Sequence, residues 1–290
     1  MVESVAARQG GAVQGIDLRA CLRYTTERQT TQGGFCFYAY RPWGIEEPNT
    51  PDTLAGVSIL QRLGHPVPRR ERCVAWLREQ QDPSGGYPTA VIGYAALEAL
   101  RRLGAEPAGD PRSFLRRSAA THGLSGEGPV TRELRIVLKC LELWREHGLS
   151  PSRAVRARVS DLLRLAHADD GGYGTSGANL AESAVAVALA REIDMPVDGH
   201  AVLAYVRHCE RPPYGFNVTP SALSSDLETQ RAGLWLLRAL GGRLRHAGRV
   251  SGYVALCQNA SGGFGRAPGA IARLDDTLRA LDILAWLDLG

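Results

Sequence analysis

The sequence predicts an all-α fold in which six helical hairpins form two layers of an α/α barrel. Three observations support this prediction: a recurring Gly-Gly-aromatic signature, an apolar helix after each turn, and an arginine-rich amphipathic helix before most turns. The signature occurs four times, at Gly33-Gly34-Phe35, Gly85-Gly86-Tyr87, Gly171-Gly172-Tyr173 and Gly262-Gly263-Phe264.

The spacing of the turns predicts the number of repeats. The last two intervals are about twice the first, and degenerate turns at Gly123-Leu124 and Pro213-Tyr214-Gly215-Phe216 fill the gaps. Six units of roughly forty to fifty residues lie in the period range of helical arrays. We therefore expect a single domain over residues 1–290. A residue with a positive φ is needed where the chain reverses after each outer helix, and glycine adopts it without strain.

The helices are of two kinds. Those after the turns are apolar on most faces, which suits an inner layer that is buried on several sides. We expect them at 51–63, 90–103, 131–143, 179–193, 226–240 and 275–287. Those before the turns combine arginine with one apolar stripe, as an outer layer requires. We expect them at 70–80, 111–120, 152–167 and 201–209. Strict alternation gathers the inner helix starts around one mouth, and an open solenoid is the structural alternative.

Composition excludes several classes of function. The chain is 44% hydrophobic and 22% charged, with a net charge of +4 and scattered basic residues, which argues against nucleic-acid or membrane-surface binding. No apolar run approaches the roughly 18 residues of a membrane span. The six cysteines have no metal-finger spacing and no signal peptide is recognised, so we expect reduced thiols in the cytoplasm.

Acidic residues recur at the starts of the inner helices. Five of the six units place a carboxylate at one register of our alignment, and a small hydroxyl residue follows in four. These carboxylates are Asp52, Glu133, Glu182, Glu228 and Asp276. Acids in the first helical turn complement the helix dipole and cap free N–H groups, and we expect this role for the first three.

The fifth and sixth units carry more acid than capping requires. Asp226 with Glu228, and Asp275 with Asp276, should bring four carboxylates to one side of the mouth. Like charges this close cannot all ionise cheaply, so at least one pKa should rise and provide a proton donor. All-oxygen ligands also suit a divalent cation such as Mg²⁺ or Ca²⁺ and disfavour Zn²⁺. The residues alone leave both interpretations open.

Aromatic residues cluster around the same turns. Ring faces attract positive charge, so an aromatic wall beside an acid suggests a cavity that binds a hydrophobic substrate and stabilises a cation. The substrate-binding candidates are Tyr38, Trp43, Tyr87, Tyr173, Tyr214, Phe216, Trp235 and Phe264. For the ring directly after each Gly-Gly pair, the alternative is a staple that packs the turn onto its neighbour.

The segment from Cys257 to Gly269, followed by Asp276-Thr277 and Ala280-Leu281, resembles the repeat shared by protein prenyltransferase β subunits and squalene/terpene cyclases. The resemblance covers nearly the whole chain and implies an α/α toroid, a six-fold double barrel of about twelve helices. Class II terpene cyclases carry Asp-x-Asp-Asp-Thr, which resembles Arg273-Leu274-Asp275-Asp276-Thr277 with Arg273 in place of the first Asp.

The cyclase likeness implies an isoprenoid cyclase, an isomerase or lyase of secondary metabolism that needs no cofactor. Under this hypothesis Asp275 donates the proton to a small hydrophobic substrate, and Asp276, Asp226 and Glu228 tune it. In the prenyltransferase comparison the zinc ligands fall on Asp226, Glu228 and Asp276, so two of three lack the nitrogen or sulfur donor that zinc prefers.

Two further hypotheses stay open. The second is a prenyltransferase-like enzyme that uses Mg²⁺ and an allylic diphosphate. The Arg and Lys that hold the diphosphate in that family fall on Pro220 and Leu223 here, and Arg211 and Arg266 lie nearby in sequence. The third is a non-catalytic toroid that binds a lipid or a partner protein. A partner subunit or a homo-oligomer is compatible with each hypothesis.

Overall fold

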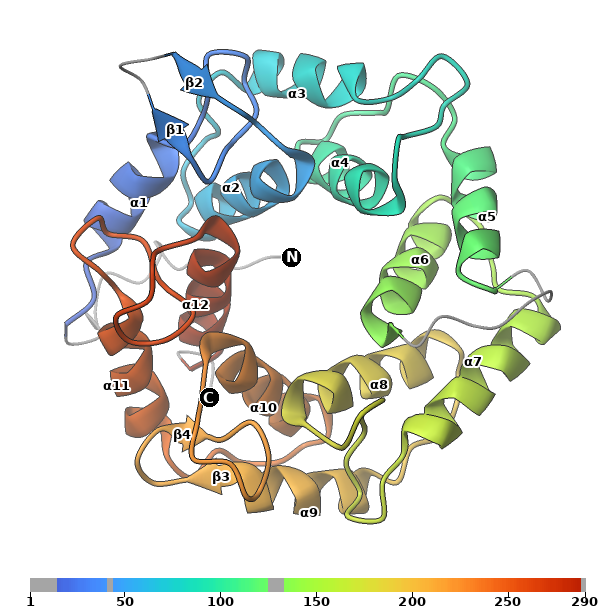
Figure 1. Cartoon of the computed structure of the whole chain (residues 1–290), viewed down its shortest axis with the longest axis vertical. Coiled ribbons are helices and arrows are strands. Elements are labelled where there is room, and N and C mark those ends of the chain that lie inside the picture. The colour runs from blue at the N-terminus through green and yellow to red at the C-terminus, as the bar shows by residue number, and fades with distance from the viewer. Residues whose placement is uncertain (1–14, 41–43, 125–132, 288–290) are drawn as a thin grey trace. The chain divides into compact units, whose positions relative to one another are not determined.

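Helices are the main secondary structure of the described chain, as the apolar periodicity predicts. The computed structural model describes residues 15–40, 44–124 and 133–287, and twelve helices lie within these ranges (Figure 1). The chain divides into two compact units, one within Met1–Asp110 and Ser251–Gly290 and the other within Pro111–Val250.

The first unit contains the beginning and the end of the described chain. Its inner helix α2 lies side by side with α4 and α12 (Figure 1). A short antiparallel pair, β1 with β2, pairs Ala39 with Glu46. The elements are α1 (Leu18–Thr26), β1 (Ala39–Tyr40), β2 (Ile45–Glu46), α2 (Thr50–Arg62), α3 (Arg70–Glu79), α4 (Ala90–Arg102), most of α11 (Ala247–Cys257) and α12 (Leu274–Leu287).

The second unit has the same hairpin organisation. Its inner helix α8 contacts α6 and α10. A second antiparallel pair, β3 with β4, pairs Glu210 with Phe216 across the degenerate fifth turn. The elements are α5 (Arg112–Thr121), α6 (Leu134–Glu146), α7 (Arg153–Ala166), α8 (Leu180–Glu192), α9 (Gly199–Cys209), β3 (Glu210–Arg211), β4 (Gly215–Phe216) and α10 (Leu227–Ala239).

Side-chain caps start four of the inner helices. The side-chain oxygens of Asn49, Thr89, Asn179 and Asp226 each accept the backbone N–H three residues later. The four capping residues have extended backbone angles, and the helix begins immediately after each of them. Each cap satisfies a donor that the helix leaves unpaired and contributes about 1 kcal/mol.

The two layers differ in burial as predicted. In α2 every residue over 55–60 is buried, and in α4 every residue over 93–100 is buried. A run of consecutive buried residues covers all sides of a helix, so these are inner helices. The outer helix α3 instead buries Cys73, Val74, Trp76 and Leu77, which lie on one stripe.

The turns repeat one hydrogen-bonding pattern. The first glycine of each Gly-Gly pair has a positive φ, from 81° at Gly85 to 109° at Gly33, which confirms the prediction. In three of the four Gly-Gly turns, the N–H of the following aromatic residue donates to a hydroxyl on the next inner helix at 2.9 to 3.0 Å. The donor and acceptor pairs are Phe35 with Thr53, Tyr173 with Ser183, and Phe264 with Thr277. Three of the four hydroxyl residues recognised beside the carboxylates therefore hold turn to helix.

The last turn of the chain packs on the first helix. Gln258 accepts the N–H of Asp17 at 2.8 Å and donates to the carbonyls of Asp17 and Gly262, each at 2.9 Å. Gln81 makes the equivalent contacts with Gly85 and Gly109 inside the second repeat. A glutamine side chain that hydrogen-bonds to both segments therefore joins α1 to the turn that precedes α12.

Three features differ from the sequence prediction. The third inner helix begins at Leu134 rather than at residue 131, because Glu133 has non-helical angles of φ −80° and ψ 82°. The outer helices α1 and α11 had no predicted ranges. The two β pairs were not predicted either, since each strand has two residues and carries no periodicity. The single domain stays a prediction.

The cysteines pack as apolar side chains. All six are buried, and burial raises the pKa of Cys21, Cys73 and Cys209 to about 12. A thiol with so high a pKa is a poor nucleophile, which agrees with a packing role for these three cysteines. Among the described helices, none combines the length and the apolar character needed to cross a membrane.

Candidate active site

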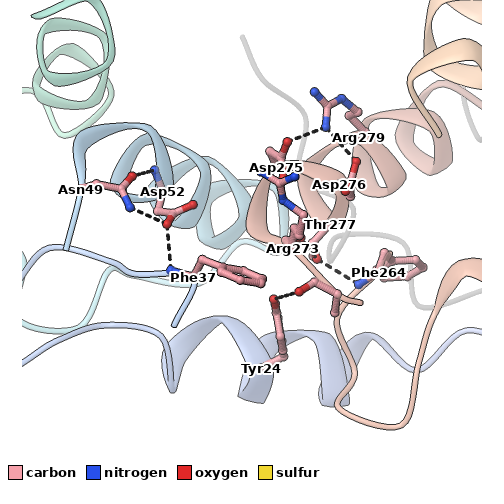
Figure 2. Close-up of polar contacts among 11 residues, drawn as sticks. Tyr24, Phe37, Asn49, Asp52, Phe264, Arg273, Asp275, Asp276, Thr277 and Arg279 are labelled. Atoms are coloured by element: carbon pink, nitrogen blue, oxygen red, sulfur yellow. Dashed lines mark hydrogen bonds and ion pairs between the residues drawn. The ribbon is translucent and has the colours of Figure 1, made fainter. Parts of the chain in front are cut away.

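Asp275 and Asp276 lie in the first turn of α12, which hydrogen bonds hold in place. The hydroxyl of Thr277 accepts the N–H of Phe264 at 3.0 Å and donates to the carbonyl of Arg273 at 2.7 Å. The N–H of Arg273 donates to the carbonyl of Phe264 at 3.0 Å. The turn and the helix start therefore form one rigid piece (Figure 2).

Tyr24 of α1 fastens the segment that leads into α12. Its hydroxyl donates to the carbonyl of Ala272 at 3.0 Å (Figure 2). Its ring lies where a side chain at Gly263 would be, since an added Cβ would come within 2.7 Å of the ring. The guanidinium of Arg28 lies 4.8 Å from the ring centre. This buried tyrosine therefore supports the acidic site without touching it.

One arginine contacts both carboxylates. Nη1 of Arg279 lies 2.8 Å from Oδ2 of Asp275 and 2.8 Å from Oδ1 of Asp276 (Figure 2). Nε of Arg273 lies 3.3 Å from Oδ1 of Asp275. Both oxygens of Asp275 are thus engaged. Within the described residues Asp276 has no polar side-chain contact besides Arg279, so its Oδ2 is unpartnered.

The two acids have opposite pKa shifts. Burial, and then the neighbouring charge of Asp275, raise the pKa of Asp276, which is 3% exposed. Burial also acts to raise the pKa of Asp275, but the hydrogen bond and charge of Arg279, together with Arg273, outweigh it and lower that pKa. Of the pair, Asp276 is thus the group with the raised pKa, and burial is the larger cause. Crowding by Asp226 and Glu228 stays a prediction.

Asp52 and Phe37 lie in the same unit as the acid pair. Oδ2 of Asp52 accepts the N–H of Phe37 and the side-chain amide of Asn49, each at 2.7 Å (Figure 2). Phe37 is 39% exposed, and the guanidinium of Arg273 lies 5.9 Å from its ring centre. Asp52 therefore fixes the backbone that carries a half-exposed ring toward α12.

The common register of the five carboxylates is confirmed for three of them. Asp52, Glu182 and Asp276 are each the third residue of their helix. Glu228 is the second residue of α10, and Glu133 precedes α6, so the register was wrong for these two. Our alignment matched the leucines of the inner helices. It was displaced in these two units because neither has, at the matching position, a hydroxyl residue that binds the preceding turn. In α10, Gln230 replaces the hydroxyl and donates to the carbonyl of Phe216 at 3.0 Å.

The predicted capping role also needs correction. Asn49 and Asn179, rather than the acids, cap α2 and α8. Asp52 and Glu182 do lie in the first helical turn, where negative charge is favourable, but their carboxylates bind loop N–H groups. Glu133 makes no side-chain cap.

Asp226 and Glu228 have structural partners inside the second unit. Oδ1 of Asp226 accepts the N–H of Thr229 at 2.7 Å and caps α10. Glu228 forms an ion pair with Arg135 of α6. Their proximity to Asp275 and Asp276, which belong to the first unit, stays a prediction.

The same two residues bear on the metal hypotheses. A carboxylate that is paired with an arginine and one that caps a helix are poor ligands, and in the described parts of the chain no three His, Cys, Asp or Glu side chains are grouped to hold a metal ion. Binding of zinc or Mg²⁺ by the four carboxylates stays a prediction.

The aromatic candidates fall into two groups. Those after the turns are buried, with Phe216 and Phe264 at 0% exposure and Tyr87 and Tyr173 below 10%, which agrees with the staple interpretation. Tyr38 and Tyr214 are exposed, as is Arg266, and Trp235 is half-buried with Arg191 at 5.6 Å from a ring centre. Trp43 lies outside the described residues. Substrate binding by these residues stays a prediction.

Sequence reasoning missed Arg279. The signal was present, since Arg279 follows Asp275 by four residues and Asp276 by three, and residues at these spacings meet on a helix surface. Arginine is frequent in this chain, however, and the spacing alone does not single out this one. Asp52 was recognised as an acid, but its partner Phe37 was not predictable from either residue.

The comparisons with known proteins identify the class. The family model of the prenyltransferase alpha-alpha toroid domain matches residues 4–88 and 136–289, so the chain belongs to this family and the predicted α/α toroid is confirmed. Among solved structures, a variant of the type II terpene cyclase MstE from Scytonema, in complex with its product merosterolic acid A, is similar to the chain at 15% identity and a TM-score of 0.49. The alignment covers 93% of this chain and 95% of that one. No curated protein matches the sequence.

Proposed function

We propose that this protein is an isoprenoid cyclase that starts a carbocation cyclisation by protonating its substrate from the acid pair at the start of α12. The observation that carries the proposal is the asymmetry of that pair. Asp275 is an ion-paired carboxylate with a lowered pKa, while Asp276 is buried, has a raised pKa and keeps one oxygen that has no partner among the described residues. When the surroundings of two carboxyl groups move their pKa values apart, the group with the higher pKa can act as the acid and the other remains an anion.

Asp276 is the better proton donor of the two. A general acid must hold its proton until the substrate arrives, and burial beside the anion of Asp275 favours the protonated form. Its Oδ2 is the atom available to carry that proton, because Arg279 contacts Oδ1. Sequence reasoning gave the donor role to Asp275 and the tuning role to Asp276, and the contacts favour exchanging them.

The initiating step needs no co-reactant. The proton on Oδ2 of Asp276 moves to a carbon of a substrate alkene, or to the oxygen of an epoxide, and the electron pair of the O–H bond stays on the carboxylate. The substrate becomes a carbocation, which a second double bond attacks to close a ring. Loss of a proton from the cyclised cation to solvent, followed by reprotonation of Asp276, completes the cycle.

The groups around the acid pair suit this chemistry. The new negative charge on Asp276 lies 2.8 Å from the Arg279 guanidinium, which stabilises it at the moment it forms. The half-exposed ring of Phe37 is held by Asp52, and an aromatic face attracts a cation by roughly 0.5–2 kcal/mol. These groups support a site in which proton donor, counter-charge and cation-stabilising surface are close together.

Product analysis tests the proposal. The protein is incubated with farnesyl diphosphate, geranylgeranyl diphosphate, squalene and oxidosqualene, with and without Mg²⁺, and the products are identified by mass spectrometry. A cyclic isomer of unchanged mass, formed without Mg²⁺, is the expected result. A product that has lost diphosphate and requires Mg²⁺ would contradict the proposal and favour the prenyltransferase-like hypothesis.

Turnover should fall as pH rises. The acid form of Asp276 is required, and its pKa lies above the ordinary value of 3.8, so activity is retained below that raised pKa and lost as pH increases through it. Replacing Asp275 with asparagine removes the anion that raises this pKa. The pH at which turnover falls should therefore become lower. The measurement is kcat against pH for parent and variant. If kcat fell at the same pH in both, the assignment of Asp276 as the acid would be contradicted.

Stability should respond to the same two groups in opposite directions. Protonation of Asp276 stabilises the fold at low pH, and this contribution is lost as pH rises through its raised pKa. The ion pairs of Asp275 contribute above the unfolded-state pKa and are lost as pH falls through its lowered pKa. A pH profile of turnover is therefore a more selective probe of Asp276 than a profile of stability.

The arginine contacts of Asp275 favour a second candidate function. A carboxylate neutralised by two guanidinium groups is also a stable structural feature, which is compatible with a non-catalytic toroid that binds a lipid or a partner. Recovery of an isoprenoid unchanged from a tight complex, with no product from any substrate in the panel, would favour this candidate over the cyclase.

A further inference from the structure

Arg279 is the residue that connects the two acids. It lies one turn after Asp275 and Asp276 on the same face of α12, and its side chain is 23% exposed. The same nitrogen, Nη1, approaches both carboxylates at 2.8 Å. A single atom that touches two groups sets their separation, whereas two independent ion pairs would leave each carboxylate free to rotate.

The guanidinium group is suited to this role. It is planar, permanently charged and carries its donors in a fixed arrangement, so it orients the oxygens that it contacts. The packing of α12 restrains it further, since Ala280 and Leu281 beside it are fully buried. Arg273, by comparison, is 61% exposed and contacts Asp275 at the longer distance of 3.3 Å.

We infer that Arg279 is a positioning residue that holds the carboxylates of Asp275 and Asp276 in the relative orientation needed for proton transfer. This inference rests on the proposed function and adds a residue that the sequence did not assign. Arg279 contacts Oδ1 of Asp276 and not its Oδ2, and it holds Asp275 as the neighbouring anion.

A helix ion pair of purely structural value is the alternative, and the chain offers a matched control for it. On the inner helix α4, Arg101 contacts the buried Glu98 three residues earlier, with two nitrogen to oxygen distances of 2.8 Å. Such pairs contribute modestly to helix stability. Arg101→Ala therefore reports the structural cost of losing a similar contact away from Asp275 and Asp276.

The test compares kcat and KM of the parent with Arg279→Ala, Arg279→Lys and Arg101→Ala. Misplacement of a catalytic group costs on the order of 10²-fold, so we expect such a loss in kcat for Arg279→Ala with a much smaller change in KM. Guanidinium ion added to Arg279→Ala should restore part of kcat, while sodium chloride at the same ionic strength should not. Arg279→Lys should be intermediate, and Arg101→Ala should keep parental turnover.

A crystal structure of Arg279→Ala gives a readout that does not depend on turnover. The inference predicts that the carboxylates of Asp275 and Asp276 adopt new rotamers and move apart relative to the parent. Parental carboxylate positions in the variant, or parental kcat, would overturn it. If the parent itself converts no substrate, the proposed function fails, and the comparison of the two crystal structures still decides whether Arg279 positions the pair.

Discussion

Replacing Asp276 with asparagine is expected to abolish turnover while leaving the fold intact. A general acid contributes about 10²–10⁴-fold to rate, and asparagine has the shape of the protonated carboxyl but no transferable proton. Because burial already favours the neutral form of Asp276, a neutral replacement should cost little stability. The measurements are kcat for product formation and the thermal unfolding midpoint of the variant.

Asp275→Asn is the matched comparison for this prediction. In our account Asp275 supplies a fixed charge, so its loss lowers the pKa of Asp276 and reduces turnover by about tenfold for each unit of that change. It also removes the ion pairs with Arg279 and Arg273. If Asp275→Asn abolished turnover and Asp276→Asn retained it, the proton donor would be Asp275 and our exchange of roles would be wrong.

Gly262→Ala is expected to give the largest loss of stability. Gly262 has a φ of +90°, and an added Cβ would lie 2.3 Å from the backbone oxygen of Ala20 on α1. Backbone strain and overpacking each cost about 1–3 kcal/mol, so the variant should lose about 2–5 kcal/mol of unfolding free energy. The loss arises where the last turn meets the first helix. Chemical denaturation of parent and variant measures it.

Two other glycines separate the sources of this cost. Gly269 also has a positive φ, +78°, but no atom lies within 4 Å of the position that an added Cβ would occupy, so Gly269→Ala should show the strain without the collision. Gly252 lies inside α11 in open space, and Gly252→Ala should be neutral or stabilising by about 0.5–1 kcal/mol. Equal losses at Gly262 and Gly269 would show that the contact with α1 contributes nothing.

The fold was largely predictable because its signals are local. A glycine at a helix reversal predicts a positive φ from steric considerations alone, and Gly33 and Gly85 have it. The all-round apolar pattern of α2 and α4 predicts burial without knowledge of neighbours. The outer helix α11 was harder to delimit because Gly248 and Gly252 lower its helix propensity, and it is stabilised by packing of Val250 and Val254.

The candidate site was predictable in part. The motif located Asp275 and Asp276, and charge crowding predicted a raised pKa, but the identity of the raised group depends on which oxygens Arg279 and Arg273 contact. Those contacts follow from side-chain conformations that spacing does not determine. The role of Glu228 was beyond sequence reasoning for another reason, because its partner Arg135 lies on a different helix far away in the chain.

These contacts explain how Arg273, which stands in place of the first Asp of the Asp-x-Asp-Asp-Thr motif, affects the acid pair. An acid at this position would add negative charge beside Asp275, whereas Arg273 adds positive charge and lowers the pKa of Asp275. The proton is then held on the other acid of the pair. Under the proposed function, Arg273 therefore acts together with Arg279 to favour Asp276 over Asp275 as the donor.

Incorporation of solvent deuterium tests the central claim most directly. The protein is equilibrated in D₂O and incubated with the alkene substrates of the panel, and the products are examined by mass spectrometry and NMR. Initiation by protonation predicts a cyclic product with one deuteron on carbon, formed by the parent and absent with Asp276→Asn. A product without carbon-bound deuterium, formed with loss of diphosphate, would contradict proton-initiated cyclisation.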